Sequence, residues 1–147
     1  MASLQMCTFT LDRYLFGVDV RQVQEVLRAQ AMTRVPLAPG IVRGLINLRG
    51  QIVTALDLRE RLGLPRRDDV VPLNVVLRRD GAVVSLLVDE IGDVVEIDED
   101  RLEPPPSTLR GPVAEIVRAV VQMDGALLLV TDTRRATGAD LEGEARA

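Results

Sequence analysis

Hydrophobic residues along this chain gather in short aliphatic runs separated by turn residues, most clearly between Ile41 and Gly63. There, two β-branched runs meet at Leu48-Arg49-Gly50. Runs of this kind with a glycine between them predict two antiparallel strands joined by a tight turn. Gly50 can adopt the positive φ that the turn requires, which would leave Arg49 exposed at its tip.

A short capped helix is predicted directly after the second run. Asp57 precedes Glu60 at the spacing of a capping box, in which the Asp57 carboxylate accepts from the amide of Glu60 and the Glu60 side chain reaches back. Leu58 to Leu62 would form the helical turn, and Gly63 would end it. Strand, turn, strand and capped helix therefore make one unit.

The same unit occurs a second time, from Ile116 to Gly138, at an offset of 75 positions (116 − 41 = 75) and without a gap. A weaker similarity relates Val18-Asp19 to Val88-Asp89, and Val23 to Val26 to the segment from Val94 to Ile97. Self-similarity at a fixed offset predicts a duplicated structural unit, here a small β-fold. The identical pairs are Ile41 and Ile116, Val42 and Val117, Arg43 and Arg118, Gly50 and Gly125, Asp57 and Asp132, Arg59 and Arg134, and Gly63 and Gly138.

The N-terminal part reads as a hairpin followed by an ambiguous segment. Alternating residues from Leu4 to Leu11 predict a strand, and Tyr14 to Val18 a returning strand. Apolar residues at helical spacing then favour a short helix from a cap at Asp19 to about Leu27. The alternative is that Val23 to Val26 is extended.

The rest of the chain predicts further strands and few helical segments. We expect a short strand from Met32 to Val35, a boundary between halves in the polar segment from Leu64 to Asp69, and a frayed tail from Ala136. Many short strands at regular spacing predict an all-β protein made of small closed barrels. The further expected strands are Leu73 to Leu77, Val83 to Val88, Ile91 to Ile97 and Leu127 to Val130.

Composition restricts the function as much as the fold. Hydrophobic residues make up 47% but aromatic residues only 2%, so the core must be aliphatic. A formal net charge of −4 argues against general nucleic-acid binding, which requires a basic surface, and few aromatic side chains are available for stacking on bases. We expect no nucleic-acid partner.

The chain contains no histidine and a single cysteine, Cys7. Histidine-containing zinc sites and histidine-based triads are therefore excluded. Cys7 has no partner for an internal disulfide, which fits a reducing cytoplasm, and we expect it to be a buried strand residue. No apolar run is long enough to span a membrane and the N-terminus lacks signal-peptide features, so we expect a soluble, cytoplasmic protein without membrane insertion.

Two carboxylate patterns in the sequence could in principle form chemical sites. Asp57 and Asp132 occupy equivalent positions of the repeat, as the two aspartates of an aspartyl hydrolase dyad would. Neither lies in the required Asp-Thr/Ser-Gly turn, so helix capping is the simpler interpretation. The cluster from Asp98 to Asp100 lacks the spacing of a calcium loop and predicts a solvated acidic turn. We expect no catalytic residue, no metal and no cofactor.

The segments quoted above resemble the CheW family of bacterial chemotaxis coupling proteins over nearly the whole chain. The resemblance lies in Val23 to Val26, Pro39, the segment from Gly44 to Val53, and Leu56 to Arg59. It implies two SH3-like five-stranded β-barrels with short helices and a groove between them. We expect one domain over residues 1–136, with sub-barrels at about 12–68 and 69–136, a first strand that could be exchanged between them, and a flexible tail at 137–147.

The resemblance also implies a non-catalytic adaptor that couples chemoreceptors to a CheA-type histidine kinase. Expected partners are the cytoplasmic tip of the chemoreceptor, the regulatory domain of the kinase, and other CheW-like proteins in membrane-associated arrays. By position, the coupling surface would include Val23, Glu25, Gly44 and Arg49, with Gly44 permitting close approach. Asn47, Gly50 and Asp57 would keep the turn and helix in shape.

The partner surface of the second half and the pathway that the adaptor serves both have alternatives. The second half departs from the family pattern at Arg118-Ala119, at Asp132 to Arg134 and around Pro104 to Pro106, which leaves its partner surface undefined. A CheW-like scaffold for another output, such as motility or gene regulation, is the main alternative. The dyad hydrolase using Asp57 and Asp132 is the remote one.

Overall fold

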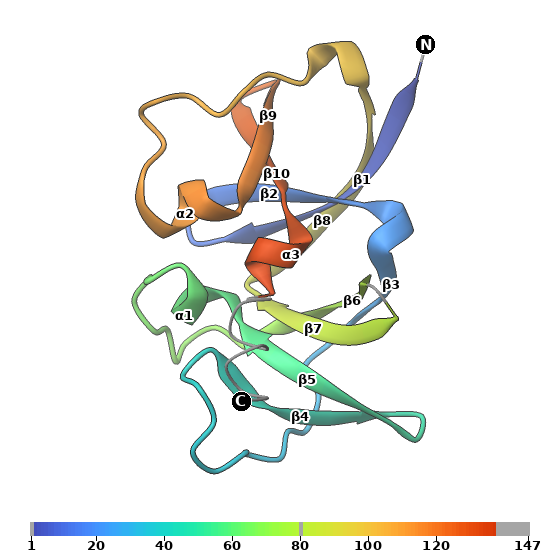
Figure 1. The fold of residues 1–147 in the computed structure, drawn as a ribbon, viewed down its shortest axis with the longest axis vertical. Helices are drawn as coiled ribbons and strands as arrows, with labels where there is room; N and C mark the ends of the chain where they lie inside the picture. Colours follow the sequence, from blue (N-terminus) through green and yellow to red (C-terminus); the bar gives the residue numbers. More distant parts are fainter. Residues whose placement is uncertain (1, 80, 138–147) are drawn as a thin grey trace.

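The computed structural model describes residues 2–79 and 81–137, which form two five-stranded sheets placed one above the other (Figure 1). Sheet A has the strand order β8-β1-β2-β10-β9, and sheet B the order β3-β6-β7-β5-β4. Sheet A is built from β1 (Ser3–Leu11), β2 (Tyr14–Asp19), β8 (Glu90–Asp98), β9 (Val117–Met123) and β10 (Ala126–Thr131). Sheet B is built from β3 (Val23–Leu27), β4 (Val42–Leu48), β5 (Gln51–Asp57), β6 (Leu73–Arg79) and β7 (Ala82–Val88).

The two sheets repeat one topology, as the internal similarity predicts. The hairpins β1–β2 and β6–β7 correspond, and so do β9–β10 and β4–β5; in each sheet one parallel pairing, β2 with β10 or β7 with β5, joins the two hairpins. Even a single backbone bond is repeated, because the amide of Asp57 donates to the Ile41 carbonyl at 2.7 Å and the amide of Asp132 to the Ile116 carbonyl at 2.7 Å. The predicted duplication is confirmed.

Sheet B is formed by one continuous stretch of the chain, β3 to β7, whereas sheet A combines β1 and β2 with β8, β9 and β10. β3 follows β2 of sheet A along the chain but pairs with β6 in sheet B, and β8 follows β7 of sheet B but pairs with β1 in sheet A. The expected sub-barrels at 12–68 and 69–136 and the expected boundary at Leu64 to Asp69 are therefore corrected, since the latter segment connects β5 and β6 within sheet B. Each sheet combines the first two strands of one copy of the repeat with the last three strands of the other copy, so the exchange involves two strands and not the first strand alone.

In each sheet, one isolated antiparallel bridge joins the segment after one edge strand to the opposite edge strand, so that the sheet partly closes on itself. Thr33, beyond edge strand β3, exchanges backbone hydrogen bonds of 2.9 and 2.8 Å with Leu45 of the other edge strand, β4. Glu103, beyond β8, does the same with Val120 of β9 at 2.9 and 2.8 Å. These bridges stand in place of the continuous closure that the sequence predicts, so the fold is SH3-like without complete barrels.

Aliphatic side chains fill the space inside each sheet and between them. One small cluster lies within sheet A, around Val121 and Leu128, and its counterpart lies within sheet B, around Ile46 and Val53. The largest cluster joins the sheets, with the stacked rings of Phe9 and Phe16 at its sheet A side. Short helices cover this joint core: α1 (Leu58–Arg61), α2 (Gly111–Ile116) and α3 (Thr133–Ala136).

Several local predictions are corrected. The helix from Asp19 ends at Gln22 as the 3-10 turn η1 (Val20–Gln22), and β3 follows, so the extended alternative is the right one. The predicted strand from Met32 to Val35 is reduced to the bridge at Thr33. Ala136 and Thr137 are buried at the end of α3 and not part of a frayed tail, and residues 138–147 lie outside the described residues.

Two further features differ from the sequence reading. α2 was not predicted, because its six residues include a proline and no side chain caps its first turn. The acidic segment after β8 forms the 3-10 turn η2 (Glu99–Arg101), which Asp98 caps by accepting from the Asp100 amide at 3.0 Å. Cys7 lies on β1 as expected but is only half-buried; burial, with a smaller contribution from Asp19, raises the pKa of its thiol.

Candidate functional site

The tip of the β4–β5 hairpin carries the most specific of the predicted site residues. Arg49 and Gly50 have φ angles of 54° and 90°, so both central positions of the turn are left-handed, as a two-residue hairpin of type I′ requires. Asn47 stabilises this turn, because its side-chain oxygen accepts from the Gly50 amide at 2.9 Å. The predicted structural role of Asn47 and Gly50 is thus visible in the geometry of the turn.

Arg49 connects this tip to strand β3 of the same sheet. Its guanidinium group forms an ion pair with the Glu25 carboxylate, although the two residues are 24 positions apart. Arg49 remains 72% exposed, whereas Glu25 is 18% exposed. An exposed pair contributes little to folding, about 0–1 kcal/mol, so its main effect is to hold a basic group at a defined place.

The other two predicted coupling residues are less accessible. The side chain of Val23 is half-buried against the joint core. Gly44 is buried, and a Cβ atom built there would lie 2.8 Å from the Thr33 carbonyl oxygen. A side chain at Gly44 would therefore first disturb the bridge between Thr33 and Leu45. The close approach that the structure shows at Gly44 is to the protein's own backbone.

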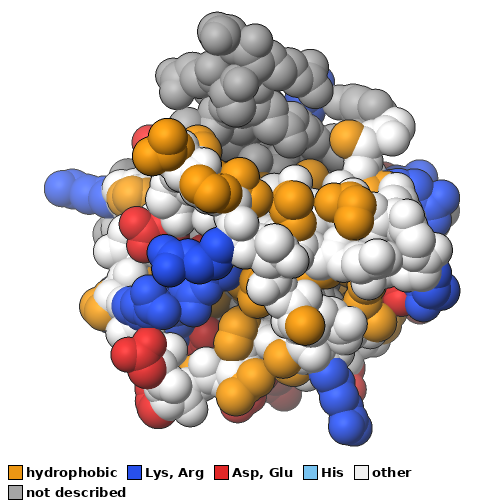
Figure 2. Space-filling view, turned by 90° about the horizontal axis from the view of Figure 1, so that it is seen from below, with side chains coloured by type: hydrophobic (Ala, Val, Ile, Leu, Met, Phe, Trp, Pro, Cys, Tyr) orange, Lys and Arg blue, Asp and Glu red, His pale blue; other side chains and the backbone are white. Residues whose placement is uncertain are grey.

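Exposed apolar side chains accompany the ion pair on the same two elements. Val26 on β3 is 40% exposed and Ile52, which pairs with Asn47 beside the turn, is 61% exposed. Seen from below, the end of the molecule made by sheet B has hydrophobic side chains next to basic ones (Figure 2). We call the ion pair of Arg49 and Glu25, together with Ile52 beside the turn, the hairpin surface. A mixed apolar and charged surface of this kind is typical of protein interfaces.

Asp57 acts as a helix cap, and only half of the predicted capping box is present. Its carboxylate accepts from the Glu60 amide at 3.2 Å and forms an ion pair with Arg43 at 3.0 Å. Glu60 does not reach back, because the Asp57 amide already donates to the Ile41 carbonyl. Asp132 similarly caps α3 through the amides of Arg134 and Arg135.

These contacts do not favour the hydrolase dyad. Each aspartate is engaged at the start of its own helix, and among residues 2–79 and 81–137 no hydrogen bond links Asp57 to Asp132. The same part of the chain contains no group of three or more histidine, cysteine or acidic side chains that could hold a metal ion. In the described part of the chain, Asp57 and Asp132 therefore serve as helix caps.

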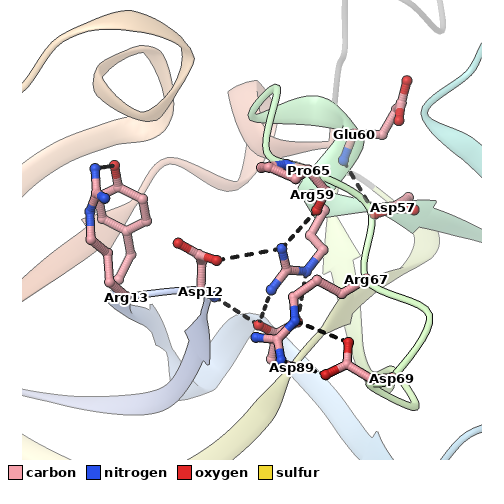
Figure 3. A network of polar contacts seen from close by, with 10 residues as sticks. Asp12, Arg13, Asp57, Arg59, Glu60, Pro65, Arg67, Asp69 and Asp89 are labelled. Carbon is pink, nitrogen blue, oxygen red and sulfur yellow. Dashed lines mark hydrogen bonds and ion pairs between the residues drawn. The ribbon is translucent and has the colours of Figure 1, made fainter.

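A buried arginine network was missed by sequence reasoning. Arg59 donates two hydrogen bonds to the Asp89 carboxylate, at 3.0 and 2.6 Å, and one to the Pro65 carbonyl at 2.9 Å (Figure 3). Asp12 lies 3.6 Å from the same guanidinium, and its amide donates to Asp89 at 2.7 Å. The network ties the β1–β2 turn to α1 and to the end of β7. The available signal was that Arg59 and Asp89 both belong to the repeat.

With this geometry established, comparison with known proteins gives the class and then the family. The fold is an all-β, SH3-like pair of sheets, and the profile described as "CheW-like domain" matches residues 5–138. The chain belongs to this family. A crystal structure described as the scaffolding protein TtCheW from Thermoanaerobacter tengcongensis matches with a TM-score of 0.81 and 28% identity, covering 88% of this chain and 89% of that one.

Sequence relatives agree with this assignment. Chemotaxis protein CheW of Bacillus subtilis (strain 168) is 30% identical over 130 residues, which cover 87% of this chain and 83% of the relative. Chemotaxis protein CheW of Treponema pallidum (strain Nichols) is 28% identical over 136 residues, covering 89% and 80%. Among the described residues, no helix has both the length and the hydropathy needed to cross a membrane.

Proposed function

We propose that this protein is a non-catalytic adaptor that couples chemoreceptors to a CheA-type histidine kinase in the cytoplasm. Membership of the CheW-like family and the similarity to a scaffolding protein support the general role of a chemotaxis coupling protein. The receptor tip and the kinase regulatory domain are the partners that we assign to this chain. We also expect recruitment to membrane-associated receptor arrays, through protein contacts alone.

The observation that carries the proposal is the position of Arg49. It is fixed at a hairpin tip by a type I′ turn, anchored to β3 by Glu25, and still largely exposed. A guanidinium group held in this way can donate several hydrogen bonds to a carboxylate or a backbone carbonyl on another chain without losing much conformational freedom. Ile52, which pairs with Asn47 next to the turn, adds exposed apolar area to the hairpin surface. We assign this surface to the receptor tip.

Gly44 and Val23 enter the proposal as indirect contributors. Gly44 allows the Thr33–Leu45 bridge to form, and this bridge holds the chain beyond β3 against β4. Val23 anchors the start of β3 in the joint core. Substitution of either residue would displace Glu25 and Arg49 and so weaken coupling without removing a direct contact.

The test is a titration of the purified chain against a receptor tip fragment and, separately, a kinase regulatory domain. We expect saturable binding to both, with Arg49→Glu weakening receptor binding by about tenfold or more, because a charge that could donate hydrogen bonds becomes one that accepts them. Arg110→Glu is the matched control, since Arg110 is exposed in the loop before α2 on the other half. Equal loss of binding in both variants would contradict the assignment.

The same titration separates the alternative output. Binding to the kinase domain but not to the receptor tip would favour a CheW-like scaffold for another pathway, such as motility or gene regulation. Binding to neither would contradict the proposed coupling role. In each case, far-ultraviolet circular dichroism of the variants establishes that a loss of binding is not a loss of fold.

A further inference from the structure

An open hollow of about 430 Å³ lies beside sheet A and is not part of the proposed coupling surface. It is formed where η1, β9, β10 and the start of α3 meet. The side chain of Gln22 donates to the Thr133 hydroxyl at 3.2 Å and so joins η1 to α3 at its wall. The residues around it are Asp19, Arg21, Gln22, Arg118, Thr131, Asp132, Thr133 and Arg134.

Two arginines in this hollow, Arg118 and Arg134, have equivalents in or next to sheet B that are paired with carboxylates. Arg59 binds Asp89 through two hydrogen bonds, and Arg43 binds Asp57 at 3.0 Å. At an offset of 75 positions (59 + 75 = 134 and 43 + 75 = 118), their counterparts are Arg134 and Arg118, both exposed. The described part of the chain provides no ion pair to either of them.

The acidic residues of the hollow are engaged elsewhere. Asp19, the counterpart of Asp89, is bound by Arg21 at 2.7 Å, and Asp132 caps α3 and lies 3.7 Å from Arg135. The hydrogen bonds from Arg21 lower the pKa of Asp19, and Arg118 adds a smaller contribution in the same direction. Arg118 therefore lies close enough to act on Asp19, but no carboxylate of the described residues forms an ion pair with it.

A buried hydroxyl in the same wall also lacks a partner. Thr131 is 4% exposed, and its Oγ1 atom has no hydrogen bond to any described residue. A buried polar group left unpaired costs about 1–3 kcal/mol, so such groups usually mark the place of a water or a ligand atom. Two arginines without carboxylates and one hydroxyl without an acceptor thus line one hollow, and all three are donors.

We propose that this hollow binds a carboxylate side chain of an acidic peptide segment. The incoming carboxylate would lie beside Asp19, whose own carboxylate is bound by Arg21, and would accept hydrogen bonds from Arg134, Arg118 and the Thr131 hydroxyl. Planar guanidinium groups match the two oxygens of a carboxylate. The inference does not depend on the coupling role, because any protein with an exposed glutamate or aspartate segment could supply the group.

The test is a nuclear magnetic resonance titration of the full chain with blocked tri-glutamate peptide and, as a matched probe, blocked tri-glutamine peptide. We expect saturating shifts of the Nε–Hε resonances of Arg118 and Arg134 with tri-glutamate and none with tri-glutamine. Arg118→Gln and Arg134→Gln should each raise the Kd for tri-glutamate about fivefold or more, since each removes a charge-assisted hydrogen bond. Arg28→Gln removes an exposed arginine next to β3 and should leave the Kd unchanged.

Thr131→Val separates binding from folding. It removes an unpaired hydroxyl, so we expect unchanged or higher thermal stability together with a Kd raised about threefold. The proposal is overturned if tri-glutamate shows no saturation, if tri-glutamine shifts the same resonances equally, or if inorganic phosphate binds as tightly, which would mean a general anion site. It is also overturned if Arg28→Gln weakens binding as much as Arg134→Gln.

Discussion

Sheet A with its adjacent helix α3 and sheet B with its adjacent helix α1 repeat one topology, but the equivalent arginines of the two helices differ in burial and in partners. On α1, next to sheet B, Arg59 is buried against Asp89, Asp12 and the Pro65 carbonyl, and it joins three segments of the chain. On α3, next to sheet A, Arg134 is exposed at the equivalent position, and Asp19 of β2 is bound by its neighbour Arg21. A duplicated fold can therefore use one copy of a polar position for internal cohesion and leave the other copy available for a partner.

A second comparison concerns the strands that approach the two bridges. Gly44 and Ala119 are equivalent (44 + 75 = 119), and each precedes a bridged residue, Leu45 or Val120. The second half accommodates the Ala119 methyl group within its own core cluster, whereas a methyl group at Gly44 would meet the Thr33 carbonyl at 2.8 Å. The same bridge thus tolerates a side chain in one half and excludes it in the other.

The largest expected difference between the halves is in the arginines. Arg59→Ala should lower the free energy of unfolding by about 3 kcal/mol, because it leaves the Asp89 carboxylate, 13% exposed, without its partner. Arg134→Ala should change it by less than about 0.5 kcal/mol, as is usual for an exposed side chain. Urea denaturation of both variants measures the difference, and similar losses in the two would contradict the distinction drawn here.

The next largest effect should come from the glycine. Gly44→Ala is expected to destabilise the protein by about 1–3 kcal/mol, since the new methyl group must displace Thr33 or β4. The reciprocal substitution, Ala119→Gly, should cost about 1 kcal/mol or less through backbone entropy. Thermal unfolding compares the two, and hydrogen exchange at the Thr33 and Leu45 amides tests the mechanism. Unchanged protection of both amides in Gly44→Ala would refute it.

The two helix caps should differ by less. Asp57→Asn and Asp132→Asn each weaken a cap, at about 1 kcal/mol or less. We expect the Asp57 variant to lose slightly more, because Asp57 also pairs with Arg43 at 3.0 Å, whereas Asp132 pairs with Arg135 only at 3.7 Å. Chemical denaturation gives the order, and the reverse order would show that the arginine pairs do not decide it.

The smallest effect is a pH dependence that arises at Asp19, at the end of β2 in sheet A. The hydrogen bonds from Arg21 lower the pKa of Asp19. A carboxyl with a lowered folded-state pKa adds stability above its ordinary pKa, and this stability is lost as the pH falls through the folded-state value. Asp19→Asn should therefore reduce stability at neutral pH and flatten the acid limb of the stability curve below about pH 4. An acid limb identical to that of the unsubstituted protein would contradict this.

What the sequence predicted well was local or periodic. The hairpin around Gly50, the cap at Asp57, the end at Gly63 and the repetition of the whole unit all depend on neighbouring residues or on a fixed offset. The extended conformation of β3 was left open, because Val20, Val23 and Leu27 also fit helical spacing. Pairing with β6 decides it, and pairing is a property of the fold rather than of the segment.

The errors in the site have the same origin. The combination of β1 and β2 with β8 to β10 in one sheet, the bridge at Thr33 and the burial of Arg59 all depend on which distant segment lies opposite. At Gly44, the tight contact that the structure shows is with the Thr33 carbonyl, and a partner's approach there stays a prediction. A single sequence indicates that a position demands a glycine; it does not indicate which backbone makes the demand.

The most direct test of the coupling role is kinase activity in a reconstituted system. Receptor-containing vesicles and a CheA-type kinase are combined with and without this chain, and kinase autophosphorylation is measured. We expect autophosphorylation to rise above that of the free kinase only when the chain is present, with the rise reduced by Arg49→Glu and retained by Arg110→Glu. Autophosphorylation that is the same with and without the folded chain would contradict the account.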